Sequence, residues 1–241
     1  HPGVDILTSV TTTMGGGLDE EIHSYQKLWD TGQYIAAALD QEGMQQGDTF
    51  ALLMQNHPEF VDAMVGASIT NTVFVPIDPR TRGEKLSYML SFSECRGVVV
   101  ADYALENLAQ IADQLPRLEW VWVLDSGSAK ITQSLPGLRL LTDIFSGPVP
   151  DLALRADDPE APMQMLYTSG TTGDPTFYPF TARDVDLTDR LWARALEFIG
   201  VRRGDRVMHA FGLSLYLAGV PLVRALERMG SMAVPVGAEV G

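Results

Sequence analysis

Cysteine and positive charge are both scarce in this sequence. One cysteine, Cys95, occurs in 241 residues, and 17 Lys and Arg residues stand against 31 Asp and Glu, which gives a formal net charge of -14. A single cysteine excludes an internal disulfide, and no metal-ligand spacing surrounds it. We interpret Cys95 as a buried, unreactive thiol and expect a reducing, cytoplasmic setting. The acidic balance argues against nucleic acid or an anionic membrane as a partner.

Long hydrophobic runs are absent as well. The uncharged run from 207 to 223 is short for a membrane span and contains His209, Gly212, Gly219 and Pro221, so it favours a buried strand, a loop and a helix. Residues 1–17 lack a basic segment followed by an apolar one, which argues against a secretory signal. We therefore expect no membrane partner.

Helical and strand-like patterns alternate along the chain. We predict helices at 25–42, from Pro58 through Ala67, at 84–92 and at 104–115, and strands at 49–54, 72–77, 97–101 and 120–124. Such alternation predicts an α/β fold with mixed or parallel sheets covered by helices. We divide the chain into a loose lead-in (1–24), a first α/β lobe (25–124), a connecting stretch rich in Pro, Gly, Ser and Asp (125–162) and a second, incomplete lobe (163–241).

A faint internal repeat supports two related lobes. The segment from Gly43 to Asp48, followed by a strand, a helix and Pro76, is echoed by the segment from Gly200 to Asp205, followed by a strand, a helix and Pro235. Gly-Asp turns between helices and strands are also common in unrelated α/β chains. We interpret both copies as structural.

A dense run of hydroxyl residues and glycines follows the predicted strand 163–167. It comprises Thr168, Ser169, Gly170, Thr171, Thr172 and Gly173. Glycines let a backbone turn its N–H groups toward polyphosphate, and hydroxyls donate further hydrogen bonds. The run has no lysine, so it is not a Walker-type loop. Downstream, Thr181 and Asp184 predict a capping box that opens a helix through Ile199.

The stretch from Tyr167 to Pro175 resembles the phosphate-binding loop of the AMP-binding, adenylate-forming superfamily. Nearly the whole chain shares this likeness, including the segments 45–56 and 75–84, which resemble early landmarks of acyl-CoA ligases. The segments 181–186, 200–206 and 234–237 are similar to the phenylacetate-CoA ligase branch. The resemblance implies the N-terminal domain of a carboxylate-CoA ligase, and its branch points to an aromatic acid among the candidate substrates.

The resemblance also implies roles for single residues. Residues 168–173 would hold the ATP phosphates, with Mg2+ sharing the charge, and coenzyme A would be the acceptor. His209, Phe211 and Gly212 would line the pocket for a small-molecule carboxylic acid, although a structural role for His209 is equally consistent with the pattern. The resemblance implies no covalent protein nucleophile, and we assign neither a catalytic residue nor a protein metal ligand.

Two departures from the family pattern keep alternatives open. Asp174 places an acid beside the proposed phosphate loop, where the similar branch often has lysine. The family's ribose-binding acid and C-terminal lysine do not occur within these residues, so we expect the 241-residue chain not to complete adenylation alone. A noncatalytic nucleotide-binding or assembly module and a carrier-dependent adenylation domain both remain alternatives. Unfilled sheet edges also leave a homodimer open.

Overall fold

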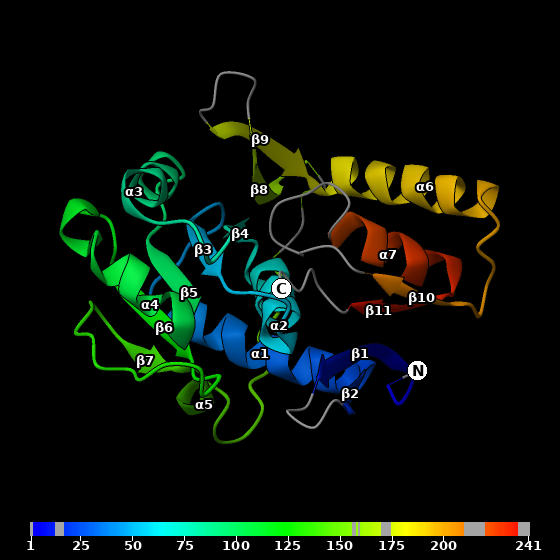
Figure 1. Cartoon of the computed structure of the whole chain (residues 1–241), viewed down its shortest axis with the longest axis horizontal. Coiled ribbons are helices and arrows are strands. Elements are labelled where there is room, and N and C mark those ends of the chain that lie inside the picture. The colour runs from blue at the N-terminus through cyan, green and yellow to red at the C-terminus, as the bar shows by residue number, and fades with distance from the viewer. Residues whose placement is uncertain are drawn as a thin grey trace.

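A computed structural model describes residues 2–12, 17–155, 158, 160–169, 175–209 and 220–235 of the chain. Figure 1 shows a larger group of elements built around one sheet and, toward the other end of the long axis, a smaller group formed by α6, α7, β10 and β11. The elements of the larger group are α1 (Tyr25–Gln41), β3 (Thr49–Leu53), α2 (Pro58–Thr70), β4 (Val73–Pro76), α3 (Gly83–Phe92), β5 (Gly97–Ala101), α4 (Asp102–Ala109), η1 (Ala112–Gln114), β6 (Trp120–Leu124), β7 (Arg139–Leu140), α5 (Leu141–Ile144), β8 (Pro162–Ser169) and β9 (Pro175–Thr181).

Seven strands of the described chain form one sheet in the order β7-β6-β5-β3-β4-β8-β9. Neighbouring strands run parallel from β7 to β8, and β9 at the edge runs antiparallel to β8. Helices cover both faces. Phe50 and Leu52 of β3 belong to the core formed with α1, α2 and α5, whereas Ala51 and Leu53 belong to the core formed with α3 and α4. Strands buried on both faces explain the continuous apolar runs in the sequence.

The fold class and most element positions are confirmed. The helix predicted at 104–115 is interrupted, since α4 ends at Ala109 and the 3-10 turn η1 follows at 112–114. The stretch predicted as a connection at 125–162 contains β7, which pairs with β6 and forms one edge of the sheet. No apolar run marks this strand in the sequence, because β7 has two residues and both are only half-buried.

The hairpin of β8 and β9 corrects the predicted lobe boundary at residue 163. The prediction assigns both strands to the second lobe, but β8 pairs with β4 through Phe74 and Gln164 and thus extends the sheet of the first lobe. The change of sheet comes later, between α6 (Ala182–Phe198) and β10 (Arg206–His209). The elements that follow are α7 (Val220–Met229) and β11 (Met232–Pro235), and β11 pairs with β10 in a parallel two-stranded sheet.

The predicted loose lead-in is wrong for residues 5–12 and 18–24. β1 (Asp5–Thr12) and β2 (Leu18–Ser24) form an antiparallel hairpin with Thr8 opposite Ile22, and β1 lies beside β11. Leu7, Thr8 and His23 are buried. Thr and Gly content is typical of irregular chain, but threonine also has a high strand propensity, and packing against α1 and β11 decides between the two.

The predicted internal repeat is confirmed in the backbone. Gly47 and Gly204 have positive φ angles of 83° and 88°, and their N–H groups donate to Asn71 O and Gly230 O, each at 2.9 Å. In both copies the aspartate that follows accepts a hydrogen bond from the backbone N–H three residues earlier, at 2.9 and 2.7 Å. Each turn leads into a parallel strand pair, β3 with β4 and β10 with β11. The two units therefore share one helix-turn-strand-helix-strand plan.

Candidate functional site

The carboxyl end of the seven-stranded sheet carries most of the polar side chains that a ligand could contact. Because β3, β4, β5, β6 and β8 are parallel, the segments that follow them emerge at one edge. Ligands of open α/β sheets bind at this edge. The residues that follow these strands lie far apart in the sequence, and the strand order alone brings them together.

The predicted phosphate-binding run begins at this edge. Thr168 and Ser169 are the last two residues of β8, and their backbones face Thr176 and Pro175 of β9. A five-residue connection, 170–174, therefore joins the two strands. Gly170, Thr171, Thr172 and Gly173 lie outside the described residues, as do the side chains of Thr168 and Ser169.

Tyr167 fixes the strand that leads into the run. Its side chain is buried at 2% exposure, and its hydroxyl donates a hydrogen bond of 2.8 Å to Met89 O in α3. Burial raises the pKa of Tyr167 to about 12, so the hydroxyl keeps the proton that it donates. This contact joins β8 to a helix 78 positions earlier in the chain.

His57 and Tyr103 form a second polar group at the same edge, which we did not predict from the sequence. The Tyr103 hydroxyl accepts from Gln55 N at 2.7 Å and lies 3.0 Å from His57 Nε2, and the two rings stack with centroids 5.9 Å apart. Burial lowers the pKa of His57 and raises the pKa of Tyr103 to about 12. The imidazole of His57 is therefore neutral, and its tautomer decides whether Nε2 accepts from the tyrosine hydroxyl or donates to it.

Two aspartates organise the neighbouring turns. After β4, Asp78 accepts from Arg80 N at 2.8 Å and pairs with Arg80 Nη2 at 2.6 Å. Burial would raise the pKa of Asp78, but the hydrogen bonds from Arg80 lower it overall. After β5, burial likewise opposes ionisation of Asp102, but hydrogen bonds from Ser126, Ala129 and Tyr103 lower its pKa. Both carboxylates are therefore ionised and structural.

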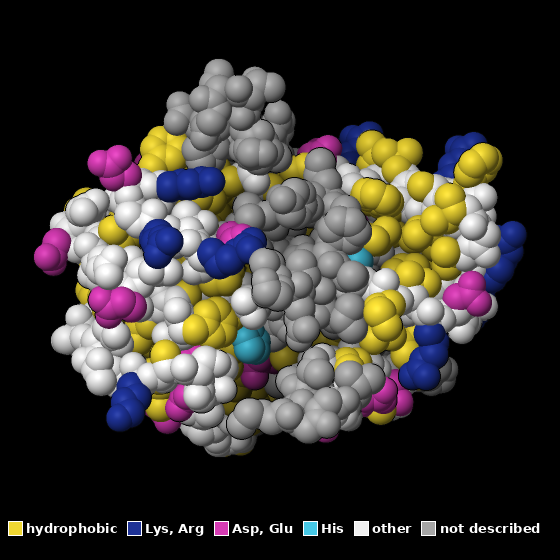
Figure 2. Space-filling model, viewed as in Figure 1, with side chains coloured by type: hydrophobic (Ala, Val, Ile, Leu, Met, Phe, Trp, Pro, Cys, Tyr) yellow, Lys and Arg dark blue, Asp and Glu magenta, His cyan; other side chains and the backbone are white. Residues whose placement is uncertain are grey.

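Basic side chains gather beside the turn after β4. Arg80, Arg82 and Lys85 lie between β4 and the first turn of α3, and Figure 2 shows Lys and Arg side chains over this region. Since β4 is the neighbour of β8 in the sheet, this turn and the predicted phosphate run follow adjacent strands. The segment 78–85 also contains Asp78 and Glu84, so its three basic residues leave a formal charge of +1 in a chain whose net charge is -14.

The predicted carboxylate pocket falls only partly within the described chain. His209 is the last residue of β10, faces Pro235 of β11 and is 1% exposed, whereas Phe211 and Gly212 lie outside the described residues. His209 and Ser169 end strands of two different sheets. A signal for His57, Asp78 and Tyr103 was present in the sequence, because each lies within four residues of a strand end that the pattern predicted.

A comparison with family models matches residues 10–214 to the AMP-binding enzyme family. The chain belongs to the AMP-binding enzyme family. The match covers the hairpin of β8 and β9, the basic turn after β4 and His209, so the family resemblance inferred from the phosphate-like run is confirmed. The narrower likeness to the phenylacetate-CoA ligase branch remains a prediction.

Known proteins of similar sequence align with most of this chain. It is 26% identical over 156 residues to 4-hydroxybutyrate–CoA ligase 2 of Metallosphaera sedula, covering 64% of this chain and 28% of that protein. It is 28% identical over 218 residues to the hybrid PKS-NRPS synthetase pyvA of Aspergillus violaceofuscus, covering 90% of this chain and 5% of that protein. The chain thus spans less than a third of the length of these relatives.

A solved structure shows the same fold. The anthranilate CoA ligase AuaEII, in complex with anthranoyl-AMP, superposes with a TM-score of 0.78 at 21% identity, covering 97% of this chain and 42% of that one. This likeness extends the AMP-binding fold to nearly all of the chain, including the N-terminal hairpin.

Membrane spans and metal-binding clusters are both missing from the described residues. No helix in the described ranges is long and apolar enough to cross a bilayer. The same part of the chain contains no group of three or more His, Cys, Asp or Glu side chains that could hold a metal ion.

Proposed function

We propose that this chain is the N-terminal part of an ATP-dependent carboxylate-CoA ligase. In the first step a carboxylate oxygen of the substrate attacks the α-phosphorus of ATP, and the bond to pyrophosphate breaks. In the second, the thiol of coenzyme A attacks the carbonyl carbon of the acyl-AMP, loses its proton, and the bond to AMP breaks. The substrate is a small carboxylic acid, and the resemblance to the phenylacetate branch favours an aromatic one.

The observation that supports this proposal is the position of Thr168 and Ser169, the first two residues of the hydroxyl-rich run, at the carboxyl end of β8. Tyr167 anchors this strand, and α/β folds bind ligands at the carboxyl edge of the parallel sheet. The backbone N–H groups and hydroxyls of the run are a donor set that fits phosphate oxygens. That set offers little to a bare cation, so we propose that Mg2+ is held chiefly by the phosphates of ATP. Charge neutralisation and alignment would then supply most of the catalysis.

Arg82 and Lys85 beside the turn after β4 support an anionic ligand at this edge, whereas Arg80 is paired with Asp78 and the imidazole of His57 is neutral. A cytoplasmic setting, with its ATP supply and reducing environment, agrees with the buried free thiol of Cys95. The match to a hybrid PKS-NRPS synthetase over 90% of this chain supports a second candidate, the adenylation domain of a synthetase that passes the acyl group to a carrier domain. Both candidates share the first reaction step and differ in the thiol.

The test is pyrophosphate exchange with a panel of carboxylic acids, measured on a longer version of the protein that extends past Gly241. Replacing Thr171 and Thr172 together with Ala should slow exchange by at least tenfold, about 1.4 kcal/mol or more of transition-state stabilisation. The matched control removes two hydroxyls far from the run, with Thr132→Ala and Ser134→Ala in the loop before β7. The control should exchange at the wild-type rate.

Three results would decide among the alternatives. Unchanged exchange in the Thr171/Thr172 variant would overturn the phosphate assignment. ATP binding without exchange for any acid would favour the noncatalytic module. Exchange followed by acyl transfer to a carrier domain, and not to coenzyme A, would establish the synthetase candidate.

A further inference from the structure

Helix α6 has an apolar face that the described chain leaves uncovered. Its inner side packs on α7 through Trp192 and Leu196, whereas Leu187 is 55% exposed, Leu191 60% and Phe198 92%. At about 100° per residue these three side chains fall within one narrow stripe along the helix. Figure 1 shows α6 along the outer edge of the smaller group with α7 on its other side, and Figure 2 shows hydrophobic side chains gathered there.

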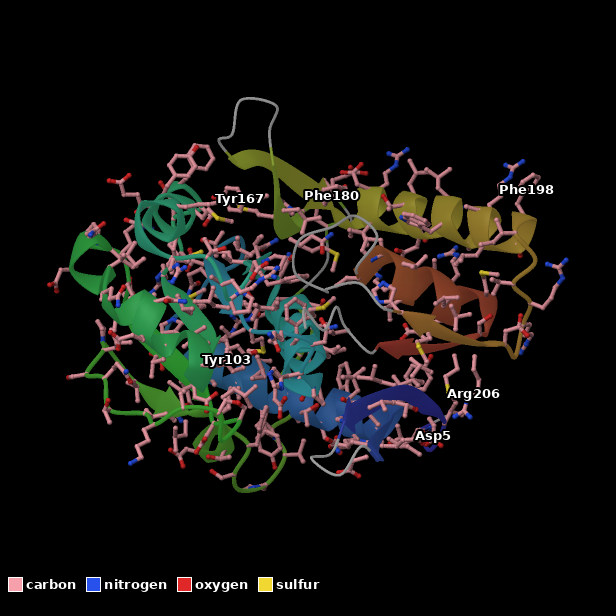
Figure 3. The ribbon with its side chains drawn as sticks, viewed as in Figure 1. Asp5, Tyr103, Tyr167, Phe180, Phe198 and Arg206 are labelled. Atoms are coloured by element: carbon pink, nitrogen blue, oxygen red, sulfur yellow. The ribbon has the colours of Figure 1, made fainter. Side chains whose placement is uncertain are left out.

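The exposed stripe has the spacing of a helix-pairing seam. The spacing between residues along the stripe alternates between three and four, which is the a/d pattern of a two-helix coiled coil. The residues at these positions are Asp184, Leu187, Leu191, Arg194 and Phe198. Figure 3 marks Phe198 at the far end of α6 and Phe180 just before its start. A solvated surface helix normally places polar side chains at these positions.

The charged residues that border the stripe favour a second copy of this chain as the partner of α6. In an antiparallel pair about a two-fold axis, the register that sets Leu187 opposite Leu191 of a second copy also sets Asp184 opposite Arg194 of that copy. The same register sets Arg183 opposite Glu197 on the flank. Each of these contacts occurs twice by symmetry. The order of charges along α6 is thus complementary to the order on a second α6 that runs in the opposite direction.

Asp184 is exposed but already accepts from Thr181 N and Oγ1 in the capping box, whereas the flanking charges are more accessible. Arg183 contacts Glu160 at 3.3 Å, but the two side chains are 78% and 55% exposed. The side chains of Arg194 and Glu197 make no ion pair with any residue of the described ranges. Arg190, which would approach its own symmetry mate near the axis, is already paired with Asp186 at 2.7 Å. This pairing reduces the repulsion at the centre of the seam.

The geometry points to α6 as a homodimer interface, in which two copies of this chain pair their α6 helices antiparallel around Leu187 and Leu191. A helix of 17 residues is about 25 Å long, so one helix pair forms an interface at the small end of the range for specific complexes. The dimer is therefore concentration-dependent, with a dissociation constant on the order of micromolar to tens of micromolar. This inference does not depend on the proposed activity.

Sedimentation equilibrium with a charge swap tests the register. Arg183→Glu places two acids opposite each other at both symmetric contacts, and Glu197→Arg places two arginines there. Each single variant should weaken the dimer roughly tenfold, and the double variant should restore it to within about threefold of the wild type. The matched control is the exposed ion pair Arg117 and Glu94, 2.7 Å apart on α3's side of the larger group, reversed in the same way.

Each outcome decides the proposal. Rescue by the double variant, with no effect of the control variants, supports the α6 pair. A wild-type chain that stays monomeric up to about 200 µM overturns it, as does a dimer whose affinity none of the α6 variants changes. Weakening without rescue also overturns it, because the helix would then meet a different surface. The measurement is repeated on the longer protein, where a monomer would overturn the pairing by showing that another segment covers α6.

Discussion

Replacing Asp62 with Asn should stabilise the folded chain, and the gain should grow with pH. Asp62 lies on α2 facing α1, is 3% exposed, and contacts the Thr31 hydroxyl at 2.6 Å. Burial raises the pKa of Asp62 to about 7, with Glu59 and Glu21 adding to the shift and Thr31 and Lys27 opposing it. The folded state therefore binds a proton that the unfolded state has already released.

The direction and magnitude of this pH effect on stability follow from proton linkage. Between the ordinary carboxyl pKa near 4 and the folded pKa near 7, the folded state holds more protons, so the free energy of unfolding falls as pH rises through this window. Well above pH 7, Asp62 is ionised in both states, and it no longer changes the free energy of unfolding as pH rises further. At about 1.4 kcal/mol for each unit of pKa difference, ionised Asp62 costs up to about 4 kcal/mol, of which about 2.6 kcal/mol develops between pH 5 and pH 8.

Asparagine keeps the shape and the hydrogen bond. The Thr31 hydroxyl has one proton and three acceptors within reach, namely Asp62 and the carbonyl oxygens of Lys27 and Leu28. When Asp62 is protonated it can donate to Thr31, while Thr31 donates to a carbonyl. The side-chain amide that Asp62→Asn introduces can donate in the same way, so the substitution removes the titration and keeps the contact.

The assay is urea denaturation of both proteins at pH 5, 6, 7 and 8. The free energy of unfolding of Asp62→Asn relative to the wild type should rise by about 2.6 kcal/mol from pH 5 to pH 8. His23 and the other titrating groups are common to both proteins, so their contributions largely cancel. Asp113→Asn, a change outside the core, is the control and should show no widening. A difference that is constant or shrinks with rising pH would refute the burial argument.

Three further predictions concern single residues. Gly97→Ala should destabilise the chain by roughly 1 to 3 kcal/mol in urea titration, because the added Cβ would lie 1.9 Å from the Trp120 ring, and an unchanged midpoint would contradict this packing. Cys95 should react with a thiol reagent at least about a hundredfold more slowly in the folded than in the urea-unfolded chain, since burial raises its pKa to about 11; equal rates would show that the thiol is accessible. In the longer protein, His209→Ala should change the KM or the ranking of acids more than the apparent ATP affinity, whereas a lowered Tm with acid preference intact would make His209 structural.

Local sequence patterns were sufficient to predict most helices and strands, because the interactions that form these elements lie within a few residues. Glycine adopts positive φ at little cost, so the turns at Gly47 and Gly204 followed from composition, and the predicted capping box is present between Thr181 and Asp184. Buried parallel strands read as apolar runs between helical segments, and these runs indicated the fold class. The hydroxyl-rich run after β8 indicated the family, because its chemistry lies in consecutive residues.

Local sequence patterns thus predicted most of the helices and strands, the repeat and the family, whereas long-range packing sets which distant residues meet. Strand order put the hairpin of β8 and β9 on the sheet of the first lobe, and no local pattern encodes a pairing such as Phe74 with Gln164. The group of His57 and Tyr103 and the raised pKa of Asp62 likewise exist only after long-range packing has removed water from around them. Propensity and capping act within a few residues, but burial and strand pairing depend on the whole chain.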